Sequence, residues 1–419
     1  MSSLARHRLI LVFALLATSV IAQPTRVALY ASVGAELTQY DVNLDGATLT
    51  KRTSVTLPAN VQYAWPHPSK QFLYVAWSNG GPVGPSTGAP PSGTLHGVTA
   101  FRIDPASGAL HPLGQPVMLP SRPIHISVDP AGTHVLIAYN DPSGVTVHRL
   151  NPDGTIAAQV KQSPGLDLGI YAHQIRVDPS GKMAILVTRG NGPTRAKAED
   201  PGALKILGYQ DGALTNRLSI APNGGFNFQP RHLDFHPTQP WIFVSLERQS
   251  KLQVYGKLAN GTLNPVALFT KDSLTDPAHV NPGQAAGTVH IHPNGRIVYQ
   301  ANRASDTVDF QGQQVFAGGE NAIAVYSINP QSGEPTLLQN ADTHGMSPRT
   351  FALDPSARIL VAANQVPFLL REGAKVTPVP ASLAVYRIAN DGKLTYARKY
   401  DVAATNPHSL FWMGLVALP

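Results

Sequence analysis

The sequence predicts an all-β protein: a seven-bladed β-propeller with four-stranded antiparallel blades, closed by its N- and C-terminal strands. Proline and glycine turns recur along nearly the whole chain, and short β-rich runs lie between them. Apolar residues at helical spacing are nearly lacking. A continuous repeat of short strands and turns is typical of a propeller.

One half of the repeat is an Asp-Pro or His-Pro turn followed by an apolar β-rich run. His67-Pro68 precedes FLYVAW, and Asp129-Pro130 precedes HVLIAY. Proline fixes φ, and Asp favours turn conformations, so each pair is expected to join two strands. The six turn prolines are Pro68, Pro130, Pro179, Pro237, Pro293 and Pro355.

The other half of the repeat is a strand that ends near a turn glycine. The seven glycines are Gly46, Gly108, Gly154, Gly212, Gly261, Gly333 and Gly392. Each unit is therefore strand a, an x-Pro turn, strand b, a loop, strand c, a glycine turn and strand d. Six x-Pro turns match seven glycine turns if residues 25–32 and 406–418 complete the last blade together, which leaves no open edge. Two separate β-sandwiches are the alternative, but no Pro/Ser-rich linker divides the chain.

Residues 1–22 have the pattern of a signal peptide. Arg6 and Arg8 precede the apolar run 9–20, and the small residue Ala22 follows. A run of about 12 residues is short of the ~20 that span a bilayer, although an uncleaved anchor is the alternative. We expect cleavage after Ala22, residues 23–419 as the propeller, and a periplasmic or secreted protein with no later membrane span.

Composition limits the partners. The chain has no cysteine, which excludes disulfides and Cys-metal sites. Loss of Arg6 and Arg8 would lower the net charge from +7 to +5, and no basic run suggests a nucleic-acid partner. The remaining positive charge favours an anionic small molecule. We expect a monomer without a cofactor.

Insertions recur at the same point of the unit, between strands b and c. They span residues 79–95, 190–202, 304–320 and 366–380. Loops at one register of a repeat emerge on one face, which is commonly the binding face. This face is where a functional site is expected.

Two columns of polar residues point to the same face when positions are counted from the turn proline. Six residues before it stand Gln62, Ile124, His173, Arg231, Gly287 and Arg349. Ten residues after it stand Ser78, Asn140, Arg189, Glu247, Arg303 and Gln365. Because strands a and b are antiparallel, the start of one and the end of the other lie at the same edge of the blade.

These columns suggest an anion site. Arginine forks bind carboxylate or phosphate with two hydrogen bonds, and histidine transfers protons near neutral pH. Glu247 is the only acid in the two columns, so no metal is expected. A network of structural ion pairs at a polar channel mouth is the alternative.

Several stretches resemble the lactonase family of seven-bladed propellers, which includes bacterial 6-phosphogluconolactonase and fungal carboxymuconate cycloisomerase. They are RPIHISVDPAG, QPRHLDFHPTQPWIFVSLERQS, GTVHIHPNGRIVYQANRASD and SPRTFALDPSARILVAANQ. The resemblance implies that a His, two Arg and a Glu line the central cleft. By motif these catalytic residues are His173 in YAHQI, Arg231 in QPRH, Glu247 in SLER and Arg303 in ANRAS. The substrate-binding candidates beside them are Arg349, Arg189, His232, His125 and Gln62.

The expected function is hydrolysis, or reversible formation, of a lactone of an anionic sugar acid or related carboxylate. His173 or Glu247 would activate water or move the proton, and the arginines would hold the anion and stabilise the oxyanion. The export signal and the insertions leave open whether the substrate is phosphorylated. The alternative is a non-catalytic propeller that binds a ligand or a partner protein in the cell envelope, with its Arg and Glu side chains satisfied by each other.

Overall fold

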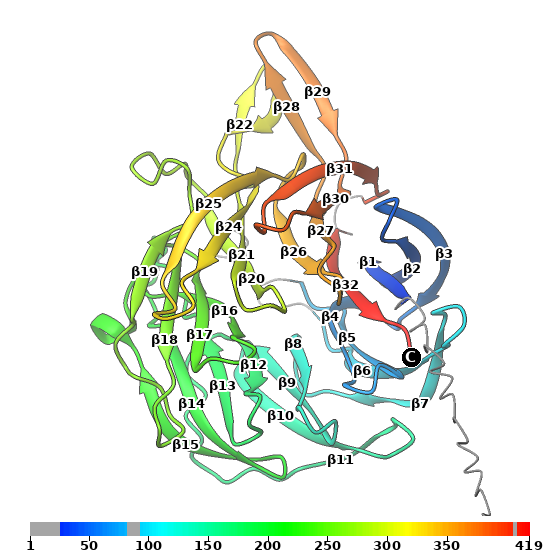
Figure 1. Cartoon of the computed structure of the whole chain (residues 1–419), viewed down its shortest axis with the longest axis vertical. Helices are drawn as coiled ribbons and strands as arrows, with labels where there is room; N and C mark the ends of the chain where they lie inside the picture. The colour runs from blue at the N-terminus through cyan, green and yellow to red at the C-terminus, as the bar shows by residue number, and fades with distance from the viewer. Residues whose placement is uncertain (1–25, 82–92, 405–408) are drawn as a thin grey trace, which may run out of the picture.

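A computed structural model describes residues 26–81, 93–404 and 409–419. It confirms the predicted all-β, seven-bladed propeller of four-stranded antiparallel sheets (Figure 1). The predicted signal peptide and most of the insertion 79–95 lie outside the described residues. In the part of the chain that is described, no helix is long and apolar enough to cross a membrane.

Six blades are continuous in sequence and run from the inner strand a to the outer strand d. Blades 1 to 3 consist of β4 (Asn60–Pro66), β5 (Phe72–Ser78), β6 (His96–Ile103), β7 (Leu110–Met118); β8 (Pro123–Val128), β9 (His134–Asn140), β10 (Ser143–Leu150), β11 (Ile156–Gln159); and β12 (Ala172–Val177), β13 (Met183–Thr188), β14 (Ala203–Gln210), β15 (Ala213–Ile220). Blades 4 to 6 consist of β16 (Pro230–Phe235), β17 (Trp241–Leu246), β18 (Lys251–Gly256), β19 (Phe269–Asp272); β20 (Ala285–Ile291), β21 (Ile297–Arg303), β24 (Ala322–Ile328), β25 (Pro335–Asp342); and β26 (Pro348–Leu353), β27 (Ile359–Asn364), β30 (Ser382–Ile388), β31 (Leu394–Asp401). A short 3-10 helix, η1 (Pro222–Gly225), connects blades 3 and 4.

The seventh blade joins the two ends of the chain, as predicted. Its inner strand is β32 (Leu410–Ala417), followed outward by β1 (Val27–Val33), β2 (Glu36–Asn43) and β3 (Thr48–Thr56). The pairing of β1 with β32 runs from Val27↔Ala417 to Val33↔Leu410. This blade has no x-Pro turn because its strands a and b come from opposite ends of the chain.

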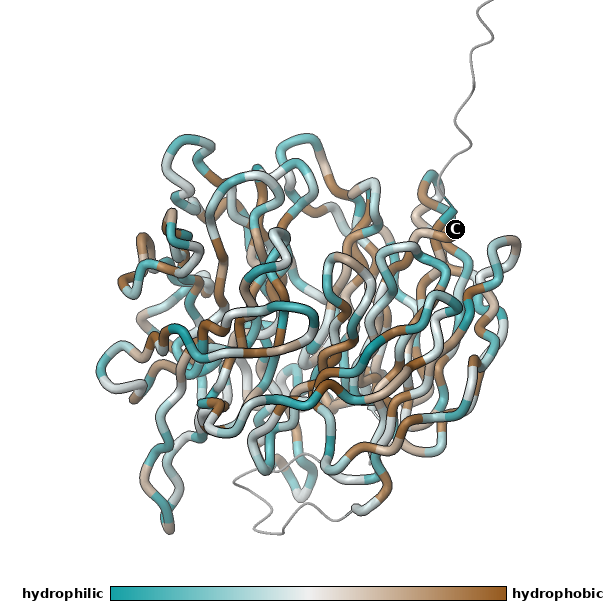
Figure 2. The backbone as a smooth tube through the Cα atoms, turned by 90° about the horizontal axis from the view of Figure 1, so that it is seen from below, coloured by the Kyte–Doolittle hydropathy of each residue, from teal (hydrophilic) through white to brown (hydrophobic). Residues whose placement is uncertain are grey.

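The blades are held together by apolar layers and by hydrogen bonds that repeat around the ring. The strand-b run FLYVAW, for example, is buried throughout. Buried tyrosines of strand b donate to the glycine-turn carbonyl of the next blade: Tyr74 Oη lies 3.0 Å from Gly154 O, and Tyr299 Oη lies 2.9 Å from Gly392 O. Seen from the side, apolar stretches run through the blades and polar stretches lie mainly in the turns at the two faces (Figure 2). The glycine turns therefore also fix the neighbouring blades.

Two of the b–c insertions form hairpins that project beyond the ring of blades (Figure 1). They are β22 (Thr307–Phe310) with β23 (Gln313–Phe316) in blade 5, and β28 (Phe368–Glu372) with β29 (Lys375–Val379) in blade 6. Phe316 packs edge to face on Phe368 with ring centroids 5.6 Å apart, so the hairpins support each other.

Candidate functional site

A β-bulge stands at the start of the inner strand in all seven blades, and in the seventh it skips Phe411, between Leu410 and Trp412. In blade 4 the register runs from Pro230↔Leu246 to His232↔Ser245 and skips Arg231. The positions skipped in the other six blades are Gln62, Ile124, His173, Arg231, Gly287 with Thr288, and Arg349. A bulge bends its strand and re-aims the extra side chain. The first column found in the sequence is thus a set of bulged residues, and the bulge re-aims their side chains.

Glu247 is the centre of an arginine cluster at this edge. It follows β17, and its side chain is 9% exposed. Arg189 Nη1 donates to Oε2 at 2.9 Å and Arg231 Nε donates to Oε1 at 3.1 Å. Arg303 Nη2 also bonds Oε1. The sequence prediction that these four residues share one edge is therefore met by direct contact.

The cluster carries more positive than negative charge. Within the described residues, all salt bridges of Arg189, Arg231 and Arg303 go to Glu247. Arg349 adds a fourth guanidinium, stacked 3.9 Å from the ring centroid of Phe411. Buried positive charges in this proportion favour binding of an anion.

The pKa values reflect this imbalance. Burial opposes the charged form of Glu247, but the three contacting arginines outweigh it and lower the carboxyl pKa to about 2. Burial, followed by repulsion from Arg303, lowers the pKa of Arg231 to about 9. Burial and the neighbouring arginines also hold the pKa of Arg349 well below its usual range. An incoming anion would relieve the repulsion among the guanidinium groups.

Three histidines form a buried row next to the arginines. The ring centroids of His173 and His232 are 5.1 Å apart, and those of His232 and His125 are 6.1 Å apart. Burial, reinforced by arginine charges, holds the pKa of all three well below the usual value. All three are neutral at pH 7, and the same lowering of the pKa makes His173 a weak base in the free protein. Tyr63 ends the row, 4.4 Å from His125.

Several hydrogen-bonding atoms in this region have no protein partner among the described residues. Arg231 Nη1, Arg303 Nε and His173 Nδ1 are all buried without one. Buried polar atoms in native proteins normally have partners, so such a group indicates a place for water or ligand. Two donors and a neutral imidazole suit an oxyanion and a proton transfer.

A cavity of about 960 Å³ opens at the mouth beside the cluster. Arg189 and Glu247 line it, together with the loop 190–202 and the connections into β12 and β20. Arg231 and Arg303 meet this wall through Glu247, which both contact. The insertion 190–202 therefore shapes the site, as its position in the repeat suggested.

The remaining predicted residues lie around this centre. His232 and His125 belong to the histidine row. Gln62 stands on the bulge of β4 but donates from Nε2 to Asn60 O at 3.0 Å, and no hydrogen bond joins it to the arginines among the described residues. No three His, Asp or Glu side chains come together as a metal site in the described ranges.

The sequence reasoning missed a second polar layer further along the inner strands. Arg176 Nη1 lies 3.4 Å from Asp234 Oδ1, and His290 Nδ1 lies 3.6 Å from Asp234 Oδ2. Arg176 also stacks on Trp65 at 4.6 Å. These residues stand three positions before the turn proline, so the count that found the first column would have found them too. Tyr63 was also missed, although it stands five positions before its proline, as His125 and His232 do.

Comparisons with known proteins bear on this geometry. The family model described as "Lactonase, 7-bladed beta-propeller" matches residues 20–367. The 6-phosphogluconolactonase of Bacillus subtilis is 28% identical over 303 residues, which cover 69% of this chain and 78% of that protein. The 6-phosphogluconolactonase of Serratia proteamaculans is 25% identical over 374 residues, covering 89% and 93%. The structure of the Pseudomonas aeruginosa periplasmic gluconolactonase PpgL superposes with a TM-score of 0.67 at 20% identity, over 94% of this chain and all of that one, a likeness of fold.

Proposed function

Because the chain belongs to the lactonase family of seven-bladed β-propellers, we propose that it hydrolyses a lactone of an anionic sugar acid or related carboxylate. The membership confirms the resemblance found in the sequence. The observation that carries the proposal is the excess of arginine over glutamate in a cluster that lies beside a neutral, buried His173 and whose Arg189 and Glu247 line an open cavity. The anion of the substrate would supply the missing negative charge.

The proposed reaction uses His173 as the base, because a bound substrate anion offsets the arginine charges that, together with burial, lower the pKa of His173 in the free protein. Its imidazole takes a proton from water as the water oxygen attacks the lactone carbonyl carbon. The charge that develops on the carbonyl oxygen is met by Arg231 Nη1 and Arg303 Nε, two buried donors with no partner among the described residues. The ring C–O bond then breaks, and His173 returns the proton to the departing alkoxide. The product is the open hydroxy acid, which ionises to a carboxylate.

Glu247 has a different proposed part in this scheme. A carboxylate with a pKa of about 2 is a weak base, so it is poorly suited to activate water. Its contacts to three arginines instead fix the positions of their guanidinium groups. Arg189, Arg349, His232, His125 and Gln62 are proposed to bind the rest of the substrate.

The test is a panel of lactones that differ in charge. Glucaro-1,4-lactone and 6-phosphogluconolactone carry an anion, whereas glucono-1,5-lactone is neutral. Hydrolysis followed by pH-stat should show a higher kcat/KM for at least one anionic lactone, and Arg303→Ala should remove that preference. If the wild-type protein hydrolyses no lactone faster than a variant lacking both His173 and Arg231, the proposal is wrong.

A non-catalytic envelope propeller is the second candidate, because Glu247 is already satisfied by three arginines. The two functions separate when melting temperature and kinetics are measured on Ala variants of His173, Arg231 and Arg303 and on Glu247→Gln. A catalytic site predicts folded proteins with defects in turnover or binding. A structural network predicts lower melting temperatures with unchanged activity per folded molecule.

We also propose that the protein is exported and begins at Gln23. The charged flank, short apolar run and small Ala22 support this. The similar Pseudomonas protein is described as periplasmic. N-terminal sequencing of the periplasmic fraction should return Gln-Pro-Thr, whereas an intact Met1 or Ser2 there would contradict cleavage.

A further inference from the structure

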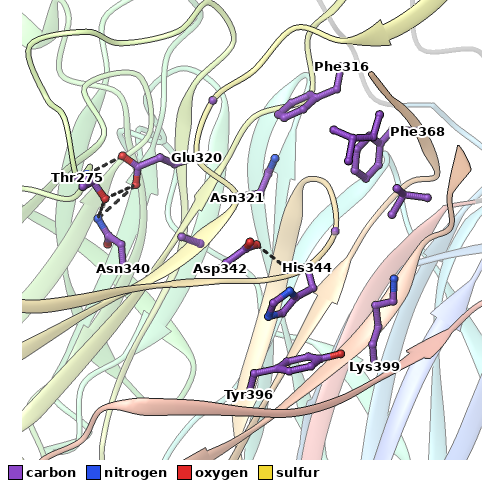
Figure 3. Close-up of a pocket in the computed structure, with 15 residues that line it drawn as sticks. Thr275, Phe316, Glu320, Asn321, Asn340, Asp342, His344, Phe368, Tyr396 and Lys399 are labelled. Carbon is purple, nitrogen blue, oxygen red and sulfur yellow. Dashed lines mark hydrogen bonds between the residues drawn. The ribbon is translucent and has the colours of Figure 1, made fainter. Parts of the chain in front are cut away.

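A second cavity, of about 690 Å³, lies away from the mouth, between the outer strands of blades 5 and 6 and the two projecting hairpins (Figure 3). Phe316, Phe368, Leu370 and Val379 of the hairpins form its apolar wall. Tyr396, 41% exposed, adds an aromatic face from β31. The hairpins are insertions, so the apolar wall of this cavity is built from residues added to the repeat.

The opposite wall is polar and carries two acids and one lysine. Glu320 and Asp342 face Lys399 across the cavity, and His344 stacks on Tyr396 with ring centroids 4.0 Å apart. Glu320 Oε1 accepts from the amide of Thr275 at 2.6 Å, and Asn340 Nδ2 donates to Glu320 Oε2 at 3.3 Å. Asn340 Oδ1 is buried with no partner among the described residues. The wall thus offers fixed acceptors beside an aromatic face.

This combination suits a saccharide. A pyranose has an apolar C–H face, which packs on aromatic rings, and hydroxyl groups at its edge that both donate and accept hydrogen bonds. Carboxylate, amide and ammonium groups serve those hydroxyls without requiring a charge on the ligand. The arginine mouth, by contrast, favours an anion.

A third cavity shares lining residues with each of these two. Its volume is about 400 Å³, and it shares Gln284 with the mouth and Glu320 with the outer cavity. Gln284 Nε2 lies 3.3 Å from Arg303 O and 3.0 Å from Glu320 O. Glu320 N returns a hydrogen bond to Gln284 Oε1 at 2.7 Å. The Gln284 side chain therefore joins the backbone of Arg303 to the backbone of Glu320, which lines the outer cavity.

We propose that the outer cavity is a saccharide subsite that holds the sugar attached to the lactone unit, so that the substrate class is a lactone at the end of a di- or oligosaccharide. The proposal rests on the function proposed above. The carboxylate or lactone end occupies the arginine mouth, and the next sugar passes Gln284 and stacks on Tyr396 and Phe368.

The experiment measures binding of aldonates, which carry the carboxylate of the hydrolysis product. Titration calorimetry compares gluconate with cellobionate and maltobionate, each of which adds one glucose. At least one of the two aldobionates should bind about fivefold to tenfold more tightly than gluconate, the range expected for one sugar stacked on an aromatic face. Tyr396→Ala and Phe368→Ala should each bring this ratio close to one and leave gluconate binding unchanged.

Asp342→Asn keeps the size of the side chain and removes its charge. It tests the contribution of the polar wall to the same ratio of aldobionate to gluconate affinity. Phe226→Ala is the matched control, because Phe226 is an exposed aromatic residue that lines neither cavity. Aldobionates that bind no more tightly than gluconate, or a ratio unaffected by Tyr396→Ala and Phe368→Ala in folded protein, would overturn the subsite. Failure of the proposed function looks different: no lactone is hydrolysed, while the preference for aldobionates and its loss in the variants persist.

Discussion

The inner strands and the adjoining ends of strands b carry two polar layers, and the layers differ in charge balance. At the mouth, Arg189, Arg231 and Arg303 share Glu247. In the layer nearer the x-Pro turns, Asp234 is matched by Arg176 and His290 and accepts from the backbone amides of Phe235 and Ile291, each at 3.0 Å.

The comparison separates structure from function within one set of strands. A balanced, hydrogen-bonded group is satisfied without a ligand, and breaking it exposes an unpaired charge. An unbalanced group costs stability until an anion binds, which is typical of a binding site. The same residue types thus have opposite expected effects when they are removed from the two layers.

The largest expected effect is on turnover. His173→Ala should lower kcat by about 10²–10⁴-fold, the usual contribution of a positioned base. His290→Ala is the control from the balanced layer and should leave kcat within about twofold. Both are measured by initial rates on the best lactone of the panel. Equal losses in the two variants would remove the distinction between the layers.

Arginine removal should affect binding at the mouth and stability in the other layer. Arg231→Ala should weaken binding of an anionic substrate by about 2–5 kcal/mol, because a desolvated, charge-assisted contact is lost. Arg176→Ala should leave affinity nearly unchanged and lower the melting temperature. Calorimetry and thermal unfolding on both proteins check this, and a reversed pattern would contradict the assignment.

Loss of the acid in the balanced layer should cost about 1–3 kcal/mol of unfolding free energy. Asp234→Asn leaves Arg176 without its carboxylate, and the side chain of Asp234 is 17% exposed, so solvent offsets part of the loss. Denaturant titration measures the change. Full stability in this variant would show that the layer is not held by its ion pair.

Removal of one arginine from the mouth should stabilise the free protein. Arg349→Met keeps an apolar contact with Phe411. It also removes a guanidinium group whose pKa is held well below the usual range by burial. We expect a gain of about 1 kcal/mol in unfolding free energy together with weaker anion binding. A loss of stability would show that Arg349 is already compensated in the folded protein.

The smallest effect concerns pH. His125, His173 and His232 have folded pKa values well below 6.5, so the unfolded chain binds protons near pH 6 that the folded protein does not. Stability is therefore greatest at higher pH and should fall by about 0.7 kcal/mol per histidine from pH 7 to pH 6. His125→Phe, which keeps the aromatic packing on Tyr63, should reduce the fall by that amount. An unchanged pH slope would mean that folding does not lower the pKa of His125.

Local chemistry determined much of this protein in advance. Turn residues and strand alternation act over a few positions, so the x-Pro and glycine turns predicted seven blades and the closure by β1 and β32. The same spacing placed His173, Arg231, Glu247 and Arg303 at one edge. Those positions could be read from the sequence because the distance along a strand is nearly constant.

Contacts between blades were decided only by the tertiary structure. Whether Glu247 meets one arginine or three depends on how adjacent blades are rotated and on the bulge that turns Arg231 toward it. The link from Arg303 through Gln284 to the outer cavity joins residues of blade 5 with an inserted loop. The repeat spacing of the sequence could not predict this contact. Charge balance is likewise a property of neighbours in space, which is why the sequence located the polar columns but could not tell a satisfied layer from an unsatisfied one.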